Sequence, residues 1–436
     1  MDESPSKRSL LYQVWVVCTL GFLIDGYDLY ISSIAEPFTN LRFHPSAFMA
    51  GMTQAATPIG AALGAILVGR LSNYISKRSM LIFNLLFFVV IALFSAFAWN
   101  ALSLCVFRFL IGFGVGADYP FCASYLTEVS PKKQSSQLIA SAMFINCTAA
   151  PVGILAAWLI FKLYPHVDAW RWMYASAAIP AFIALMLRVR LPSGFISNAH
   201  KGLTDHTKSV LANYQKLFSP KFFKMTWCLC LSWILQDISY YGIGEFTPSV
   251  LQAFHISSGT DLITSTNEVL KSTLFINIFV LAGAFATIFF VGRLNHIKMQ
   301  KVGFLFSFIG LLVLGVSSHA SGMLQAGMIL IGFVLFNFFI NFGPSMTSYM
   351  LPAEFYEEES RPTMSQGFAA SLGKLGVFAG AICLPVLQVC IGIYLTTAIL
   401  TGFLFVGLIW SYWNESKRSA TTHQNQIKNK WVFSPI

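Results

Sequence analysis

The chain has 436 residues, of which 56% are hydrophobic and only 11% are charged, and its formal net charge is +10. An average soluble domain carries about 25% charged residues, so this composition excludes a set of water-soluble domains, a disordered chain and a coiled coil. We infer that lipid is the solvent for most of the chain, because runs of spanning length recur along it.

The first apolar stretch follows the basic residues Lys7 and Arg8 and runs from about Leu10 to Ile34. It exceeds the 7–15-residue core of a signal peptide and fits a spanning helix of about 20 residues. Later runs have similar length, and they are too evenly apolar for the alternating strands of a barrel. We therefore predict an all-α membrane protein with twelve transmembrane helices. The predicted spans are Leu11–Ala35, Ala47–Gly69, Ser79–Trp99, Leu102–Leu126, Gln137–Leu163, Trp170–Arg190, Lys224–Val250, Lys271–Gly292, Lys301–His319, Gly322–Met350, Met364–Cys390 and Gly392–Trp413.

Lysine and arginine are unevenly distributed between the two sides that these spans define. Of the 28 basic residues, we place 22 at the termini or in loops on the same side, Arg188 among them, and four on the opposite side. Arg108 and Lys374 lie within spans. This bias predicts that both termini are cytoplasmic. It also accounts for the net positive charge of the chain without a role in nucleic-acid binding. Short tails and loops favour a bacterial inner membrane.

The longest polar stretch between spans divides the chain into two six-helix halves. We predict an amino-terminal half over 1–190, a cytoplasmic linker over 191–223, a carboxy-terminal half over 224–413 and a cytoplasmic tail over 414–436. A Gly-Arg-Leu motif follows the second span and recurs after the eighth, six spans later. Parallel six-helix repeats around a site at the membrane midplane are typical of one class of secondary transporters.

Six charged residues stand out away from the ends of the predicted spans, and a charged group at the bilayer centre costs at least about 2.5–3.5 kcal/mol. They are Asp25, Asp28, Arg108, Asp118, Asp237 and Lys374. Asp25 and Asp28 are three residues apart and share a helix face, so one of them is favoured to keep a proton and could carry it across. Alternatively, one of these acids only neutralises Arg108. Arg108 and Asp118 lie ten residues apart, about 15 Å along a helix, so each needs a partner elsewhere.

The seventh span carries Trp233, Asp237 and Tyr241 at every fourth position, and these form one stripe. The indole N–H is a hydrogen-bond donor, the carboxylate is an acceptor, and the phenol hydroxyl can donate or accept. This set suits a ligand that both donates and accepts hydrogen bonds. For the aromatic pair, packing or an interfacial belt is the alternative. Lys374 lies ten residues into its span, where an anionic ligand or a nearby acid would keep it charged. Asn341 lies on a Pro-broken helix and suits a ligand contact or an interhelical bond equally.

These motifs together resemble the major facilitator superfamily and, within it, the phosphate:proton symporter family. The resemblance covers essentially all twelve spans. It is carried by Asp25-Gly-Tyr-Asp28-Leu, Gly112-Phe-Gly-Val-Gly-Ala-Asp118-Tyr119-Pro120, the stripe from Trp233 to Tyr241, Asn341-Phe-Gly-Pro344 and Gly373-Lys374. It implies the major facilitator fold and a proton path containing Asp118 and either Asp25 or Asp28, with Arg108 as a modulating charge. It also implies a phosphate site formed by Tyr119, Trp233, Asp237, Tyr241 and Asn341, with Lys374 nearby.

Several positions depart from the family's pattern. Asn146 stands in the region where the family has a glutamine, and Ser345 stands where an asparagine usually follows Gly-Pro. Asn73 and Ser76 replace the acid and the glycine of the loop after the second span. These changes leave room for another small anion or an organic metabolite as the substrate.

We therefore predict a proton-coupled symporter that imports inorganic phosphate by alternating access. Its expected partners are phosphate, protons and the lipid bilayer, with no cofactor, metal, nucleic acid or obligate protein partner. A proton symporter for a small organic acid or sugar on the same fold is the alternative. A non-transporting nutrient receptor is disfavoured by the short tail after Trp413, and an enzyme by the lack of a nucleophile–base pair in the sequence.

Overall fold

The computed structural model of the chain describes residues 5–71, 77–131, 134–190, 217–220, 223–244, 262–355 and 362–432. Helices make up nearly all of these ranges, which contain no strand. Ten helical stretches are long and apolar enough to cross a membrane. The expected all-α membrane fold is confirmed.

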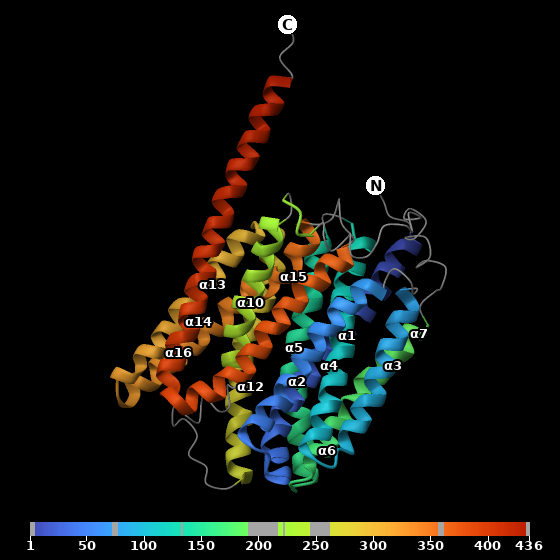
Figure 1. Cartoon of the computed structure of the whole chain (residues 1–436), viewed down its shortest axis with the longest axis vertical. Coiled ribbons are helices and arrows are strands. Elements are labelled where there is room, and N and C mark those ends of the chain that lie inside the picture. The colour runs from blue at the N-terminus through green and yellow to red at the C-terminus, as the bar shows by residue number, and fades with distance from the viewer. Residues whose placement is uncertain are drawn as a thin grey trace.

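The helices follow the predicted spans in chain order (Figure 1). The amino-terminal half contains α1 (Pro5–Phe43), α2 (Ala47–Leu71), α3 (Lys77–Ala96), α4 (Ala101–Val129), α5 (Ser135–Leu163), α6 (Ala169–Ser176) and α7 (Ala178–Val189). The carboxy-terminal half contains α10 (Phe223–Gly244), α12 (Leu262–Phe290), α13 (His296–Val316), the 3-10 turn η2 (Ser317–His319), α14 (Gly322–Phe342), α15 (Pro344–Phe355) and α16 (Pro362–Val432). Most of the predicted linker lies outside the described residues, so its boundaries stay a prediction.

Some spans are divided or joined in ways that hydropathy does not reveal. The sixth span consists of α6 and α7, and the tenth consists of α14 and α15. The tenth breaks at Gly343, whose φ of −117° and ψ of −92° leave the helical region directly before Pro344. The last two spans form the single element α16, which turns at Gly392, where a φ of +79° favours glycine. Beyond residue 413, α16 projects from the bundle as far as Val432 (Figure 1).

Two of the twelve predicted spans are not among the ten apolar stretches. The seventh is α10, and the last residues of its predicted span, 245–250, lie outside the described ranges. The eleventh is the first segment of α16, whose apolar stretch covers Gly367–Ile382. Both carry charged residues of the candidate site, Asp237 and Lys374, which lower their hydropathy.

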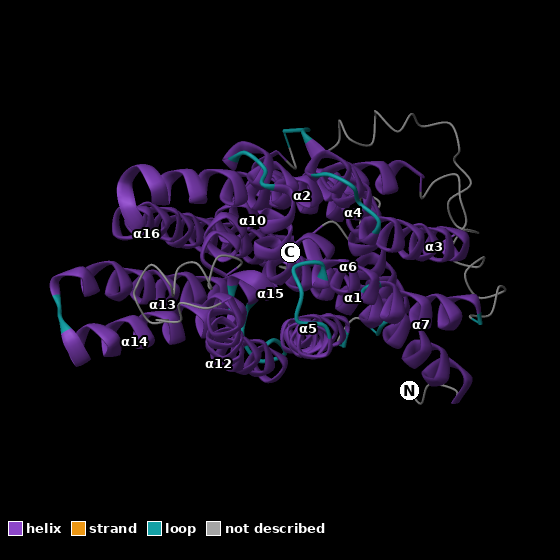
Figure 2. Cartoon of the chain, turned by 90° about the horizontal axis from the view of Figure 1, so that it is seen from below, coloured by secondary structure: helices purple, strands orange, loops and turns teal. Residues whose placement is uncertain are grey.

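The two halves meet mainly through α2 and α4, which contact α16, and through α5, which contacts α12. α15 also contacts α4 and α5. Seen from below, α13 and α14 lie on one side of the molecule, α3 and α7 lie on the other, and α15 lies between them (Figure 2). Both chain ends lie at the same end of the bundle (Figure 1).

The apolar cores show where the halves are joined. One cluster contains residues of both halves, among them Leu126 and Met143 from the amino-terminal half and Met346 and Tyr349 from the other. It lies toward the end that carries the termini, because it includes Val14 near the start of α1. Two further clusters are confined to one half each: the cluster around Trp170 belongs to the first half, and the cluster around Phe336 belongs to the second. The halves are therefore sealed together at the terminal end.

Glycines allow α2 and α4 to approach closely. A Cβ atom added to Gly112 would lie 2.0 Å from the carbonyl oxygen of Thr57, and one added to Gly116 would lie 1.9 Å from that of Ala61. No side chain fits at such separations, so the backbones themselves are in contact.

We predict that Gly112→Ala lowers the melting temperature of the purified protein in detergent, because the added methyl group must push α2 and α4 apart. Gly51→Ala on α2 is the matched control, since its added Cβ would meet nothing within 4 Å. Alanine favours a helix over glycine by about 1 kcal/mol, so the control should be neutral or stabilising. Equal melting temperatures for the two variants would contradict the close contact.

Candidate functional site

A central cavity lies between the two halves. Its lining is shared by α1, α4 and α5 of the first half and α10, α14, α15 and α16 of the second. The residues that line it are Asp25, Gly26, Leu29, Tyr30, Val115, Met143, Asn146, Cys147, Gln236, Asp237, Tyr240, Tyr241, Asn341, Ser345, Met346, Tyr349 and Lys374. The volume of this cavity is about 60 Å³. The joint apolar cluster borders it through Met143, Met346 and Tyr349.

Five of the ten predicted site residues line this cavity: Asp25, Asp237, Tyr241, Asn341 and Lys374. All three charged residues among them are buried. The Lys374 ammonium lies 5.3 Å from the centre of the Tyr241 ring, so a cation–π contact holds it at the cavity wall. The Asn341 amide donates to the carbonyl of Asn337 at 2.9 Å within its own helix.

Asp25 faces this cavity from α1 and is 4% exposed. Its Oδ2 atom has no hydrogen-bond partner among the described residues. A buried carboxylate oxygen without a partner is costly when ionised, and a proton on the carboxyl removes much of that cost. Asp25 can therefore exchange its charge for a proton at the surface where a ligand would lie.

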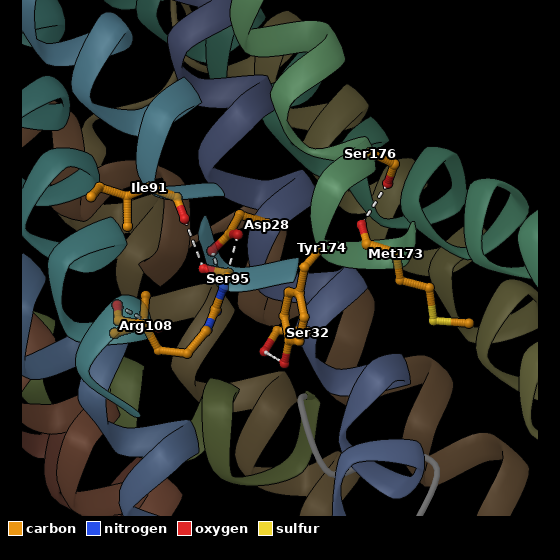
Figure 3. A network of polar contacts seen from close by, with 9 residues as sticks. Asp28, Ser32, Ile91, Ser95, Arg108, Met173, Tyr174 and Ser176 are labelled. Atoms are coloured by element: carbon orange, nitrogen blue, oxygen red, sulfur yellow. Dashed lines mark hydrogen bonds and ion pairs between the residues drawn. The ribbon is translucent and has the colours of Figure 1, made fainter. Parts of the chain in front are cut away.

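Asp28, by contrast, is engaged away from the cavity. Both of its carboxylate oxygens accept from the same Nη of Arg108, each at 2.8 Å (Figure 3). The Arg108 guanidinium also lies 5.4 Å from the centre of the Tyr174 ring, whose hydroxyl is 3.4 Å from that of Ser32 (Figure 3). Of the two first-span acids, Asp28 is thus the one that neutralises Arg108.

Asp118 also forms a buried ion pair, and its partner corrects the sequence analysis. Arg188 of α7 donates to both Asp118 oxygens, at 2.7 Å and 2.8 Å, and to the carbonyl of Leu81 at 3.0 Å. The prediction that Arg188 belongs to the cytoplasmic loops is wrong, because its side chain is 0% exposed. Asn84 adds a hydrogen bond to Asp118 at 3.2 Å. A role for Asp118 in the proton path stays a prediction.

Trp233 does not line the cavity. It is buried one helical turn from Asp237, and its ring contacts that of Tyr349 at 4.6 Å between centroids. A Cβ atom on Gly373 would lie 2.5 Å from the indole, so the residue before Lys374 is small enough to let α16 approach α10. The indole nitrogen has no hydrogen-bond partner among the described residues. The stripe therefore reaches the cavity only through Asp237 and Tyr241.

The remaining expectations concern the departures from the family's pattern and Tyr119. Asn146 and Ser345 both line the cavity, and the Asn146 amide donates to the carbonyl of Phe22 on α1. The side chain of Tyr119 and the loop residues Asn73 and Ser76 lie outside the described part of the chain.

Sequence reasoning missed four polar residues of the lining, Tyr30, Gln236, Tyr240 and Tyr349. The hydroxyls of Tyr30 and Tyr240 lie 3.4 Å apart and join the two halves across the cavity. Helical spacing held a signal for Tyr30, which follows the cavity residue Gly26 by four positions. Gln236 is a polar residue beside Asp237 in the same apolar span, which was the available signal there.

We predict that Arg188→Met and Asp118→Asn each lower the free energy of unfolding by about 3–5 kcal/mol, because each leaves a buried polar or charged partner uncompensated. The double variant should recover part of this loss. The measurement is thermal unfolding in detergent.

The control is Arg42→Met. Arg42 contacts Asp168 at 3.3 Å with a side chain that is 54% exposed, and exposed pairs contribute only about 0–1 kcal/mol. A loss at Arg188 no larger than the loss at Arg42 would contradict the buried pair.

Comparisons with known proteins identify the fold and the family. Residues 18–381 match the Major Facilitator Superfamily. The low affinity inorganic phosphate transporter 4 of Medicago truncatula is 26% identical, over 87% of this chain and 84% of the relative's length. The putative metabolite transport protein YaaU of Escherichia coli is 24% identical, over 90% and 88%. The proton:xylose symporter XylE bound to 6-bromo-6-deoxy-D-glucose has a similar structure, with a TM-score of 0.76 at 18% identity over 93% of this chain and 96% of that one.

The XylE likeness concerns the fold, and the superfamily match covers most of the chain. Family and fold are those of transporters and not of enzymes. The chain is an integral membrane protein that belongs to the major facilitator superfamily.

Proposed function

We propose that this transporter is a proton-coupled symporter that imports inorganic phosphate through the central cavity. The observation that carries the proposal is the meeting of Asp25, Asp237 and Lys374 in one buried cavity between the halves. The inorganic phosphate transporters among the relatives support the same substrate.

The size of the cavity favours a small ligand. A water molecule needs about 10–15 Å³ of such space, so about 60 Å³ holds on the order of four waters. Phosphate is of this size, whereas a sugar has about twice as many non-hydrogen atoms and would require the cavity to widen.

The charges of the cavity favour coupling to protons. When Asp25, Asp237 and Lys374 are all ionised, the two carboxylates outnumber the one ammonium. A phosphate anion adds further negative charge, and protonation of Asp25 offsets it. Proton and phosphate therefore strengthen each other's binding, and this linkage is reciprocal.

Asp237 and Tyr241 supply the contacts that would distinguish phosphate from other anions. Phosphate that still carries a proton can donate to the Asp237 carboxylate and accept from the Tyr241 hydroxyl. Fully ionised sulfate has no proton to donate, so it would face Asp237 as a repelled charge.

Transport then follows from motion of the halves about the cavity. Loading takes place while the apolar cluster seals the terminal end, which the positive-inside bias assigns to the cytoplasm. Separation of this cluster opens the cavity to the cytoplasm, where the higher pH removes the proton from Asp25. Phosphate then leaves because the negative charge of the cavity has increased.

A proton symporter for a small organic acid is the second candidate. The observation that favours it is that Asn146 and Ser345, which depart from the phosphate family's pattern, both line the cavity. Carboxylates share the negative charge of phosphate but present a planar group with fewer donors.

We predict that proteoliposomes containing the protein accumulate labelled phosphate when an inward proton gradient is imposed. Excess unlabelled phosphate should abolish this uptake, while sulfate, xylose and a panel of small carboxylates should leave most of it. Equal uptake with and without the gradient would refute coupling, and competition by a carboxylate would indicate the second candidate.

We also predict that Asp25→Asn abolishes gradient-driven accumulation but retains exchange of labelled for unlabelled phosphate, because the amide mimics the protonated acid at every pH. Asp168→Asn is the control, since Asp168 pairs with Arg42 outside the cavity and should leave both activities unchanged. Normal accumulation by Asp25→Asn would exclude Asp25 as the proton carrier.

A further inference from the structure

A second hollow lies on the outside of the amino-terminal half, between the beginning of α1 and the end of α7. It is lined by Tyr12, Gln13, Val16, Val17, Leu187 and Arg190, none of which lines the central cavity. The volume of this hollow is about 280 Å³, compared with about 60 Å³ for the central cavity. We call it the α1–α7 groove.

The groove has an apolar floor and a polar rim. Val16, Val17 and Leu187 form the apolar part, and Tyr12, Gln13 and Arg190 supply a hydroxyl, an amide and a guanidinium. The Tyr12 wall is anchored, because its ring stacks on Trp15 at 6.0 Å and the Trp15 indole donates to Ser141 at 3.0 Å. The groove therefore combines an apolar surface with hydrogen-bond donors from Tyr12, Gln13 and Arg190.

Arg190 is available to a ligand. It is exposed at the end of α7 and forms no ion pair with any residue of the described ranges. Arg188, two residues earlier, is by contrast fully buried against Asp118. The positive charge at the groove is thus uncompensated by the described protein, and an anion complements it.

The position of the groove indicates where that anion comes from. α7 exposes Ile183, Met186 and Val189 on its way to Arg190, so this flank faces the acyl chains of the bilayer. The groove lies at the end that carries the termini, where α1 begins with Lys7 and Arg8 in its first turn (Figure 1). The cytoplasmic leaflet, which the positive-inside bias places here, is rich in anionic lipids.

We propose that the α1–α7 groove binds one anionic phospholipid. Its phosphate headgroup lies against Arg190 and the Tyr12 hydroxyl, and an acyl chain runs along Val16, Val17 and Leu187. Free phosphate lacks the chain that would cover this apolar floor. The lipid would link the first transmembrane helix to the sixth span, whatever substrate the transporter carries.

The test is native mass spectrometry of the full-length protein in detergent, titrated with phosphatidylglycerol or with phosphatidylcholine of the same acyl chains. We expect tighter binding of phosphatidylglycerol. Arg190→Gln should weaken that binding about fivefold, as expected for one basic residue near an anionic surface, and leave phosphatidylcholine unaffected. Arg190→Lys should retain most of the preference, because the lysine keeps the charge.

Two further variants make the outcome decisive. Arg293→Gln removes an exposed arginine after α12 in the other half and should not change lipid binding. Val16→Trp fills the groove and should reduce phosphatidylglycerol binding without removing a charge; melting temperatures confirm that each variant is folded. Equal affinities for the two lipids, equal effects of Arg190→Gln and Arg293→Gln, or displacement of the lipid by inorganic phosphate would each overturn the proposal.

Discussion

An ionised side chain in hydrocarbon requires an opposite charge or water, and this requirement organises the amino-terminal half. Arg108 satisfies it with Asp28 at 2.8 Å, and Arg188 with Asp118 at 2.7 Å. The first pair joins α4 to α1, and the second joins α7 to α4. Since breaking either pair would leave a buried charge without a partner, these pairs hold α1, α4 and α7 together. Among the acids of this half that sequence analysis singled out, only Asp25 lines the central cavity.

The joint between the halves follows the opposite principle. At the end that carries the termini, it consists of apolar residues such as Leu126, Met143 and Met346. Apolar contact is non-directional, so separating these surfaces leaves no donor or acceptor without a partner. Ion pairs in the same place would resist opening. An amino-terminal half held together by buried ion pairs, with an apolar contact against the other half, is suited to the rocking motion of alternating access.

Hydropathy predicted the twelve helices because lipid imposes both their length and their polarity. Charges within apolar spans predicted Asp25, Asp237 and Lys374 as site residues, helical spacing added Tyr241, and the Pro-broken helix added Asn341. All five line the cavity. Hydropathy could not predict how each helix is rotated against its neighbours. The predicted loop position of Arg188 is wrong for this reason, since Arg188 follows the buried Ala184 by one turn and lies on the same buried face. Trp233 was assigned to the ligand, yet the close approach of Gly373 and Tyr349 places it behind the cavity wall.

The substitution at Asn146 bears on how the cavity would recognise an anion. Its amide nitrogen donates to the carbonyl of Phe22, so this shorter side chain helps to hold α5 against α1. One of its two N–H groups is used in this way, and the other remains available. Under the proposed function, the attraction for phosphate then rests on the Lys374 ammonium and on hydroxyls such as that of Tyr241. Because one ammonium faces two carboxylates, this attraction is sufficient only while one carboxyl holds a proton, and the binding of phosphate is thereby coupled to that of the proton.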